Sequence, residues 1–136
     1  MPSQRFTAIA MIATAQVAAM ALWFSASAIV PALRASGQID PQTASLFTSA
    51  VQAGFVAGTL ISAFLGLADR IDPRKFFMAS ALIAASANAA ILAVGPESPL
   101  VIPLRFVTGV CMAGIYPVGM KLAASWAKGD MGLMVG

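Results

Sequence analysis

A short charged stretch, Asp69 to Lys75, lies between two long apolar runs and constrains the fold more than any other part of the sequence. Five of its seven residues are charged, whereas only 10% of the whole chain is. A charge at the centre of a membrane-spanning helix costs about 2.5–3.5 kcal/mol on insertion. We therefore expect this stretch to lie in water, with one spanning helix ending before it and the next beginning after it.

The apolar runs themselves predict an all-α polytopic membrane protein with four transmembrane helices. The 136 residues are 60% hydrophobic, whereas a soluble domain is about 45–50% apolar, and about 20 apolar residues cross a bilayer. Turn residues delimit the runs, and the predicted spans are residues 7–33, 41–68, 75–94 and 99–126. The apolar residues from about 131 indicate a truncated fifth span, so residues 1–136 are interpreted as a partial N-terminal transmembrane domain.

The basic residues predict the orientation of these spans. They are concentrated at one end of the predicted helices, namely Arg5, Arg70, Arg74, Lys75, Lys121 and Lys128. Arg34 falls at the other end, and Arg105 lies near that end but inside the fourth span. Because cytoplasmic loops carry the excess of Lys and Arg, we expect a cytoplasmic N-terminus and a cytoplasmic 69–75 loop. The expected location is the bacterial inner membrane.

Several function classes lack the residues that they need. The chain contains one cysteine, Cys111, and no histidine, so neither a metal site nor an internal disulfide is expected. A serine or cysteine without a nearby base is not an activated nucleophile, so no enzyme and no cofactor are predicted. The net charge of +3 comes from residues at the ends of apolar runs, which does not indicate a nucleic-acid partner.

Small residues in the second and fourth spans predict close helix packing. In the second span they recur every four residues, at Ala50, Gly54, Gly58, Ser62 and Gly66. Small residues allow helix backbones to approach closely in membranes, so we expect this face to pack against a neighbour; a face that slides during transport is the alternative. Gly109 and Pro117 predict a closely packed fourth span with a kink or a gating bend.

A few polar residues inside the spans are candidates for a substrate cavity. Arg105 either faces a cavity, where it binds an anionic group or senses a coupled proton, or it reaches the headgroups along the membrane surface. The uncharged candidates are Gln16, Trp23, Gln52, Thr108 and Tyr116. A single residue of this kind more often forms a hydrogen bond between helices than binds a ligand. As a set, these residues indicate that the first and fourth spans line the cavity.

The stretch from Leu67 to Lys75 resembles the signature loop of the major facilitator superfamily, which joins the second and third spans. Asp69, Arg70 and Arg74 match the pattern of that loop. The sequence departs from it at Leu65, Asp72 and Pro73, where the loop has glycine, glycine and arginine. The segments 105–109, 114–121 and 23–31 are also similar to family motifs, so the resemblance covers the whole chain.

The resemblance implies the first four of twelve helices of a secondary active transporter that works by alternating access. It implies that the first and fourth helices line the substrate cavity and that the third packs outside. It also implies that Asp69, Arg70, Arg74 and Lys75 belong to a gating loop. The similarity is greatest to bacterial permeases of the cyanate and nitrate group, which suggests a small anion coupled to protons. The expected partners are the lipid bilayer, a small-molecule substrate and the remaining helices of the carrier.

Two other functions remain open from the residues. One is a complete four-span carrier that dimerises, like the small multidrug-resistance proteins. Those carriers use a membrane-embedded glutamate in the first helix, and residues 6–33 contain no acid. The other is a membrane assembly protein without transport activity, joined through the face of Gly54 and Gly58.

Overall fold

The computed structural model describes residues 2–126, 129 and 132, and within them the chain is helical without strands. Its helices are α1 (Pro2–Ala35), α2 (Pro41–Leu65), α3 (Leu67–Arg70), α4 (Pro73–Val94), α5 (Val101–Met112) and α6 (Tyr116–Ala124). The helices long and apolar enough to cross a membrane are Gln4–Ala35, Pro41–Leu65, Pro73–Val94 and Val101–Ala124. The predicted all-α chain with four membrane helices is therefore confirmed. Lys128 and the predicted fifth span, apart from Gly132, lie outside the described residues.

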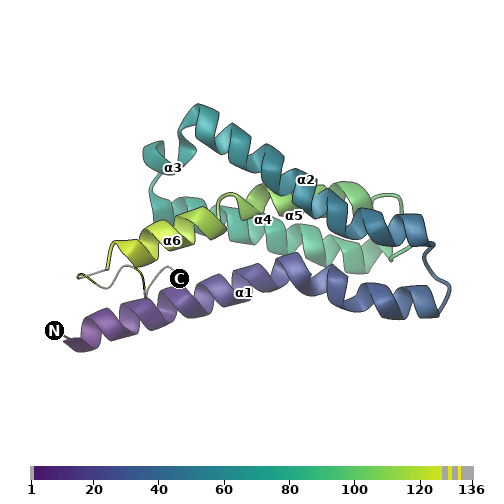
Figure 1. The fold of residues 1–136 in the computed structure, drawn as a ribbon, viewed down its shortest axis with the longest axis horizontal. Helices are drawn as coiled ribbons and strands as arrows, with labels where there is room; N and C mark the ends of the chain where they lie inside the picture. Colours follow the sequence, from purple (N-terminus) through teal and green to yellow (C-terminus); the bar gives the residue numbers. More distant parts are fainter. Residues whose placement is uncertain (1, 127–128, 130–131, 133–136) are drawn as a thin grey trace.

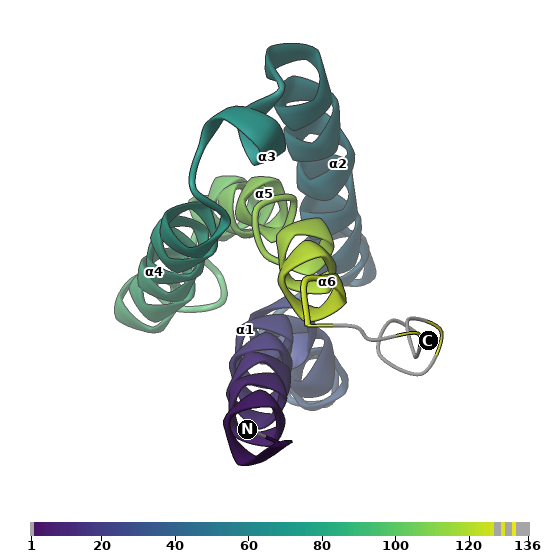
Figure 2. The ribbon, with the colours of Figure 1, turned by 90° about the vertical axis from the view of Figure 1, so that its left-hand side faces the viewer.

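The fourth span, formed by α5 and α6, lies at the centre of the bundle (Figure 2). Helices α1, α2 and α4 surround it, and α5 packs most extensively on α2 and then on α4. The long α1 runs the length of the molecule beneath the others (Figure 1). At its N-terminal end, the Arg5 Nε donates a hydrogen bond of 2.9 Å to the carbonyl oxygen of Trp126. The fourth span is consequently the most buried of the four.

Helix α2 is fixed at both ends by its own sequence. Asp40 caps its N-terminus, accepting hydrogen bonds from the backbone N–H groups of Gln42 at 2.8 Å and Thr43 at 3.0 Å, and Pro41 occupies the first turn. The helix ends at Leu65 because Gly66 adopts a left-handed conformation with φ of +61°, which glycine tolerates best. Helix α2 thus ends three residues before the predicted end of the second span, at about residue 68, and Gly66 is its C-terminal cap.

Helix α4 begins by the same device. Asp72 accepts hydrogen bonds from the backbone N–H groups of Arg74 at 2.9 Å and Lys75 at 3.2 Å, and Pro73 is the first helical residue. A proline at this position presets the helical φ and lacks only an N–H that would be unpaired. Helix α4 therefore begins two residues before the predicted start of the third span, at about residue 75. Arg74 and Lys75 belong to its first turn, and the connecting loop contains the short α3.

The fourth span is interrupted between Met112 and Tyr116. The backbone N–H groups of residues 113, 114 and 115 each bond the carbonyl three residues earlier, at 2.9–3.2 Å, which is the tighter 3₁₀ pattern. Pro117 follows in the first turn of α6 and has no N–H to donate. The predicted bend is therefore an interruption of the helix with a short linking turn. Pro31, by contrast, lies inside α1, which continues to Ala35 and bends in its C-terminal half (Figure 1).

Glycines lie where α2 and α5 approach most closely. A Cβ atom added at Gly54 would collide with the carbonyl oxygen of Phe106, and one at Gly58 would collide with the backbone of Val110. From the other side, a Cβ at Gly109 would collide with the carbonyl oxygen of Val51. Backbone therefore lies directly against backbone along this contact, as small residues permit in membrane helices.

Candidate functional site

Arg105 joins four elements at the centre of the bundle. Its side chain, on α5, is fully buried. It donates to the carbonyl oxygens of Phe47 on α2 at 3.2 Å, and of Leu22 and Trp23 on α1 at 3.1 and 2.7 Å. A fourth hydrogen bond, of 3.2 Å, reaches the Asn88 side-chain oxygen on α4. A guanidinium has five N–H groups in a fixed plane, so Arg105 can donate all four hydrogen bonds at the same time.

Asn88 completes this network from the third span. Its oxygen accepts from Arg105 and from the Ser25 hydroxyl at 3.1 Å. Its nitrogen donates to the carbonyl of Ala84 at 2.9 Å and to the Thr108 hydroxyl at 3.0 Å. The amide therefore makes hydrogen bonds through both its oxygen and its nitrogen. Buried polar groups without partners cost far more than satisfied ones, which explains why these residues occur together.

The structure places the Arg105 side chain between the helices of the bundle. It does not reach toward the membrane surface, because its guanidinium points into the bundle and contacts neighbouring helices. It also lines none of the cavities described below, and protein carbonyls occupy the donors that an anion would need. A role of Arg105 in substrate binding stays a prediction. Thr108 is likewise buried in this network, while Gln52 is exposed on α2.

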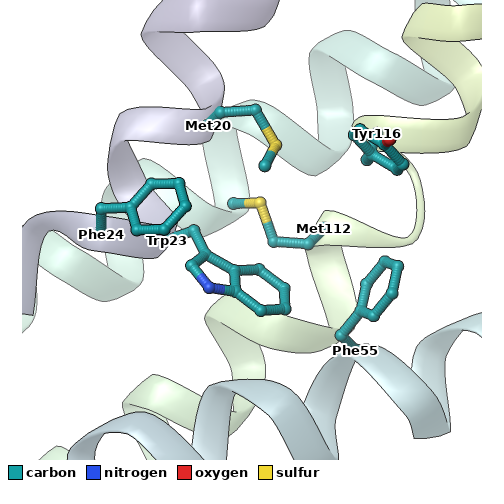
Figure 3. A pocket seen from close by; sticks show the side chains of 6 residues that line it. All are labelled: Met20, Trp23, Phe24, Phe55, Met112 and Tyr116. Carbon is teal, nitrogen blue, oxygen red and sulfur yellow. The ribbon is translucent and has the colours of Figure 1, made fainter. Parts of the chain in front are cut away.

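An apolar cavity of about 280 Å³ opens where α1, α2, α5 and α6 meet (Figure 3). Its lining side chains are aromatic or thioether-bearing, namely Met20, Trp23, Phe24, Phe55, Met112 and Tyr116. The rings of Trp23 and Phe55 meet edge to face, with centroids 5.4 Å apart and planes at 79°. Apolar pockets with few polar groups are typical small-molecule sites. Two predicted cavity residues, Trp23 and Tyr116, therefore share one cavity.

A second cavity, of about 290 Å³, continues along α1 and α6 on the other side of Tyr116. Gln16 lines it, and its side-chain oxygen is buried without a hydrogen-bond partner. The amide lies against Gly119, where an added Cβ would collide with it. Among the described residues, no α4 residue lines either cavity. The cavities thus belong to the first, second and fourth spans.

The predicted gating loop contributes one ion pair. The Lys121 Nζ on α6 donates to the Asp69 carboxylate at 2.7 Å and to the Ala68 carbonyl at 2.9 Å. The hydrogen bond and the positive charge of Lys121 lower the pKa of Asp69 below its ordinary value. Arg70, Arg74 and Lys75 are exposed and form no side-chain hydrogen bond or ion pair with a described residue.

Sequence reasoning missed two partners in these sites. Lys121 is not among the predicted site residues, although a lysine and an aspartate at the same predicted membrane surface can form an ion pair. Asn88 is not among the predicted cavity residues. Ionisable residues inside membranes usually pair with polar groups, and this rule points from Arg105 to Asn88.

Four apolar membrane helices, the fourth of them interrupted, define a polytopic α-helical membrane protein. The model of the Major Facilitator Superfamily matches residues 12–136, nearly the whole chain. The chain therefore belongs to the Major Facilitator Superfamily and is a membrane transporter protein, as the loop and fourth-span motifs predicted, and this membership indicates transport and not enzymatic catalysis. A search of curated proteins and a search of solved structures found no match.

Proposed function

We propose that this chain forms part of a secondary active transporter that moves a small solute by alternating access. The observation that carries the proposal is the position of Tyr116, which begins α6 directly after the helix interruption and lines both cavities. A movement of α6 at this interruption changes the connection between the two cavities. Alternating access in such carriers is largely the movement of one bundle against another around a fixed site, so the remaining helices of the carrier are required partners.

The cellular setting is part of the same proposal. We place the chain in a bacterial inner membrane with the N-terminus and the Asp69–Lys75 region on the cytoplasmic side, on the strength of the basic residues at that end. An Ile71→Cys variant that also carries Cys111→Ser tests the orientation, because Ile71 is exposed. A membrane-impermeant maleimide applied outside intact cells should leave it unlabelled, and labelling from outside would reverse the orientation.

Two finer expectations, a small anionic substrate and coupling to protons, depend on charged or titratable residues. Arg105 was the residue that favoured an anion, and its hydrogen bonds to three carbonyls and Asn88 leave one N–H group over. The predicted spans contain no aspartate, glutamate or histidine that could carry a coupled proton at neutral pH. Both properties therefore depend on residues beyond these spans, and the cyanate and nitrate permeases remain a prediction about the branch of the family.

The alternatives make different predictions about water access. Alternating access exposes a central residue to each side of the membrane in turn, whereas an assembly protein without transport exposes it to neither. The test uses the complete gene product with Cys111→Ser and Tyr116→Cys, in right-side-out and inverted vesicles, and a membrane-impermeant maleimide. We expect labelling from both sides. A Leu92→Cys variant is the control, because Leu92 is 85% exposed on the outer face of α4 and should face lipid. Labelling of Tyr116→Cys from neither side would overturn the transport proposal.

A further inference from the structure

The position of Trp23 in the apolar cavity depends on its backbone as well as on its ring. The indole projects from α1 into the cavity (Figure 3) and meets Phe55 edge to face. Its carbonyl oxygen accepts a hydrogen bond of 2.7 Å from the Arg105 Nη2, and the preceding carbonyl, of Leu22, accepts one of 3.1 Å from Nη1. A residue that lines the cavity and a residue of the buried network behind it are therefore joined through one short segment of α1.

Asn88 on α4 restricts the direction of these bonds. The Nη1 that bonds Leu22 also donates to the Asn88 Oδ1 at 3.2 Å. A guanidinium is rigid and planar, and its N–H groups point in fixed directions. An acceptor that holds Nη1 therefore also helps to set where Nη2 of Arg105 meets the carbonyl of Trp23.

Asn88 has a second contact with the same segment of α1. Its oxygen accepts a hydrogen bond of 3.1 Å from the hydroxyl of Ser25, which lies two residues after Trp23. The segment 22–25 is consequently attached to α4 in two ways, directly through Ser25 and indirectly through Arg105.

The amide of Asn88 is itself held in one orientation. Its nitrogen donates to the carbonyl oxygen of Ala84, one turn earlier on α4, at 2.9 Å and to the Thr108 hydroxyl on α5 at 3.0 Å. These bonds direct the amide oxygen toward Arg105 and Ser25. Among the described residues, no residue of α4 lines either cavity. A side chain outside the cavities therefore holds the backbone of a residue inside one of them.

From these contacts we infer that Asn88 is a positioning residue of the proposed substrate site. It fixes, through Arg105 and Ser25, the segment of α1 that presents the Trp23 ring to the cavity. The third span thus determines the shape of the cavity without contacting the substrate. This inference rests on the proposed transport function, because it takes the apolar cavity to be the site of the transported solute.

The fluorescence of Trp23 reports the position of its ring. The 136 residues contain two tryptophans, and the other, Trp126, bonds Arg5 through its backbone carbonyl, so Trp126→Phe preserves that contact. The experiment uses the complete gene product in nanodiscs, with phenylalanine in place of every tryptophan except Trp23. The wavelength of maximum emission and the acrylamide quenching constant are measured, because both respond to the exposure of the indole to water.

Substitutions of Asn88 separate the role of its oxygen from that of its nitrogen. Asn88→Leu has a similar size and removes both groups, which leaves Arg105 and Ser25 without this acceptor. We expect emission at a longer wavelength and a larger quenching constant, since the ring is no longer held against Phe55. Asn88→Asp retains oxygen acceptors for both partners and should give the values of the parent. If Asn88→Leu does not fold, Asn88→Ser should show the same change, because a serine hydroxyl bonds its own helix and is too short to reach Arg105.

Thr108→Val is the matched control for a loss of stability. Thr108 is buried, and its hydroxyl accepts from the Asn88 nitrogen and donates to the carbonyl of Leu104. Its removal weakens the network but leaves the Asn88 oxygen with its partners on α1 and α5. We expect a lower thermal midpoint with unchanged emission and quenching of the indole. A residue that only stabilised the bundle would not separate these two measurements.

Three results would overturn the inference. One is unchanged emission and quenching in a folded Asn88→Leu or Asn88→Ser protein, a second is an equal change in Asn88→Asp and Asn88→Leu, and a third is the same change in Thr108→Val. The maleimide labelling of Tyr116→Cys separates this failure from that of the transport function. Labelling from both sides together with any of these results leaves a transporter whose cavity does not depend on Asn88. The expected fluorescence pattern without such labelling leaves Asn88 as a positioning residue in a protein that does not transport.

Discussion

The ammonium group of Lys121 donates a hydrogen bond of 2.7 Å to the Asp69 carboxylate and thereby joins α6 to α3. The same ammonium group bonds the carbonyl of Ala68. The connection between the second and third spans is therefore attached to the end of the fourth span, and α6 is the segment that follows the helix interruption. A displacement of α6 at this contact also moves Tyr116, which begins α6 and lines both cavities.

Removal of the Asp69 charge should alter transport more than stability. In Asp69→Asn the neutral amide holds Lys121 less strongly, so we expect the carrier to shift from outward-open toward inward-open and uptake to fall. The thermal midpoint should change little, because ion pairs at exposed positions contribute little to stability. Uptake in proteoliposomes and labelling of Tyr116→Cys from each side measure the two effects. Glu97→Gln, at an exposed acid in the α4–α5 connection, is the control. Unchanged uptake and unchanged labelling in Asp69→Asn would show that the contact between Asp69 and Lys121 does not control transport.

The pH dependence of this contact follows from the pKa of Asp69. Lys121 lowers that pKa below its ordinary value of 3.8, so the paired, ionised form is favoured in the folded protein. The stabilisation is present in full above about pH 3.8 and is lost as the pH falls through the lowered pKa. We therefore expect the α3–α6 contact to be independent of pH between 5 and 8. Maleimide labelling of Ile71→Cys with Cys111→Ser, after correction for thiol ionisation, checks this. A change in the labelling rate near neutral pH would show that another titratable group controls the α3–α6 contact.

Replacement of Arg105 should destabilise the bundle even when the charge is kept. In Arg105→Lys a single ammonium group cannot reach the carbonyls of Phe47, Leu22 and Trp23 and the Asn88 oxygen together. Buried acceptors then lose their partners, and we expect the free energy of unfolding to fall by about 2–4 kcal/mol. Thermal unfolding in detergent measures the loss. Arg34→Lys, at an exposed arginine, should have no such effect, and equal stability of both variants would mean that the network contributes nothing.

A methyl group at the α2–α5 contact should force the two helices apart. Gly109→Ala places a Cβ against the carbonyl oxygen of Val51, and overpacking of this kind costs about 1–3 kcal/mol. The expected result is a lower thermal midpoint in detergent and a changed spacing between α2 and α5. Ala63→Val adds more volume at an exposed position of α2 and serves as the control. A Gly109→Ala protein as stable as the parent would show that the contact can relax.

Much of the fold was predictable because its signals are local. The four spans follow from the length of the apolar runs, and Asp40–Pro41 marks the start of the second. The same Asp–Pro signal at residues 72–73 begins α4 inside the charged stretch, so charge alone does not mark the limits of the loop. Gly66 fits the four-residue repeat of small residues and is also the C-terminal cap of α2, so the repeat does not show where the helix ends. The left-handed conformation of Gly66 depends on the hydrogen bonds at the end of the helix. A periodic pattern of small residues does not predict those hydrogen bonds.

The candidate site was predicted only in part. Trp23 and Tyr116 were expected near a cavity and share one, whereas Thr108 belongs to the Arg105 network and Gln52 is exposed. The rotation of each helix about its axis decides which of these residues meet, and this rotation depends on contacts with neighbouring helices. The sequence of one span therefore does not determine how that helix is rotated about its axis.

The amino-acid sequence by itself determined the membrane environment, the number of spans and the family, because hydrophobicity, helix caps and motifs are properties of continuous segments. The tertiary structure alone decided that Arg105 binds carbonyls of α1 and α2, that Lys121 pairs with Asp69, and that Gln16 retains an unused acceptor. Each of these contacts joins residues that are 50 or more positions apart or depends on the space left between packed helices. Such contacts arise only when the helices are packed together.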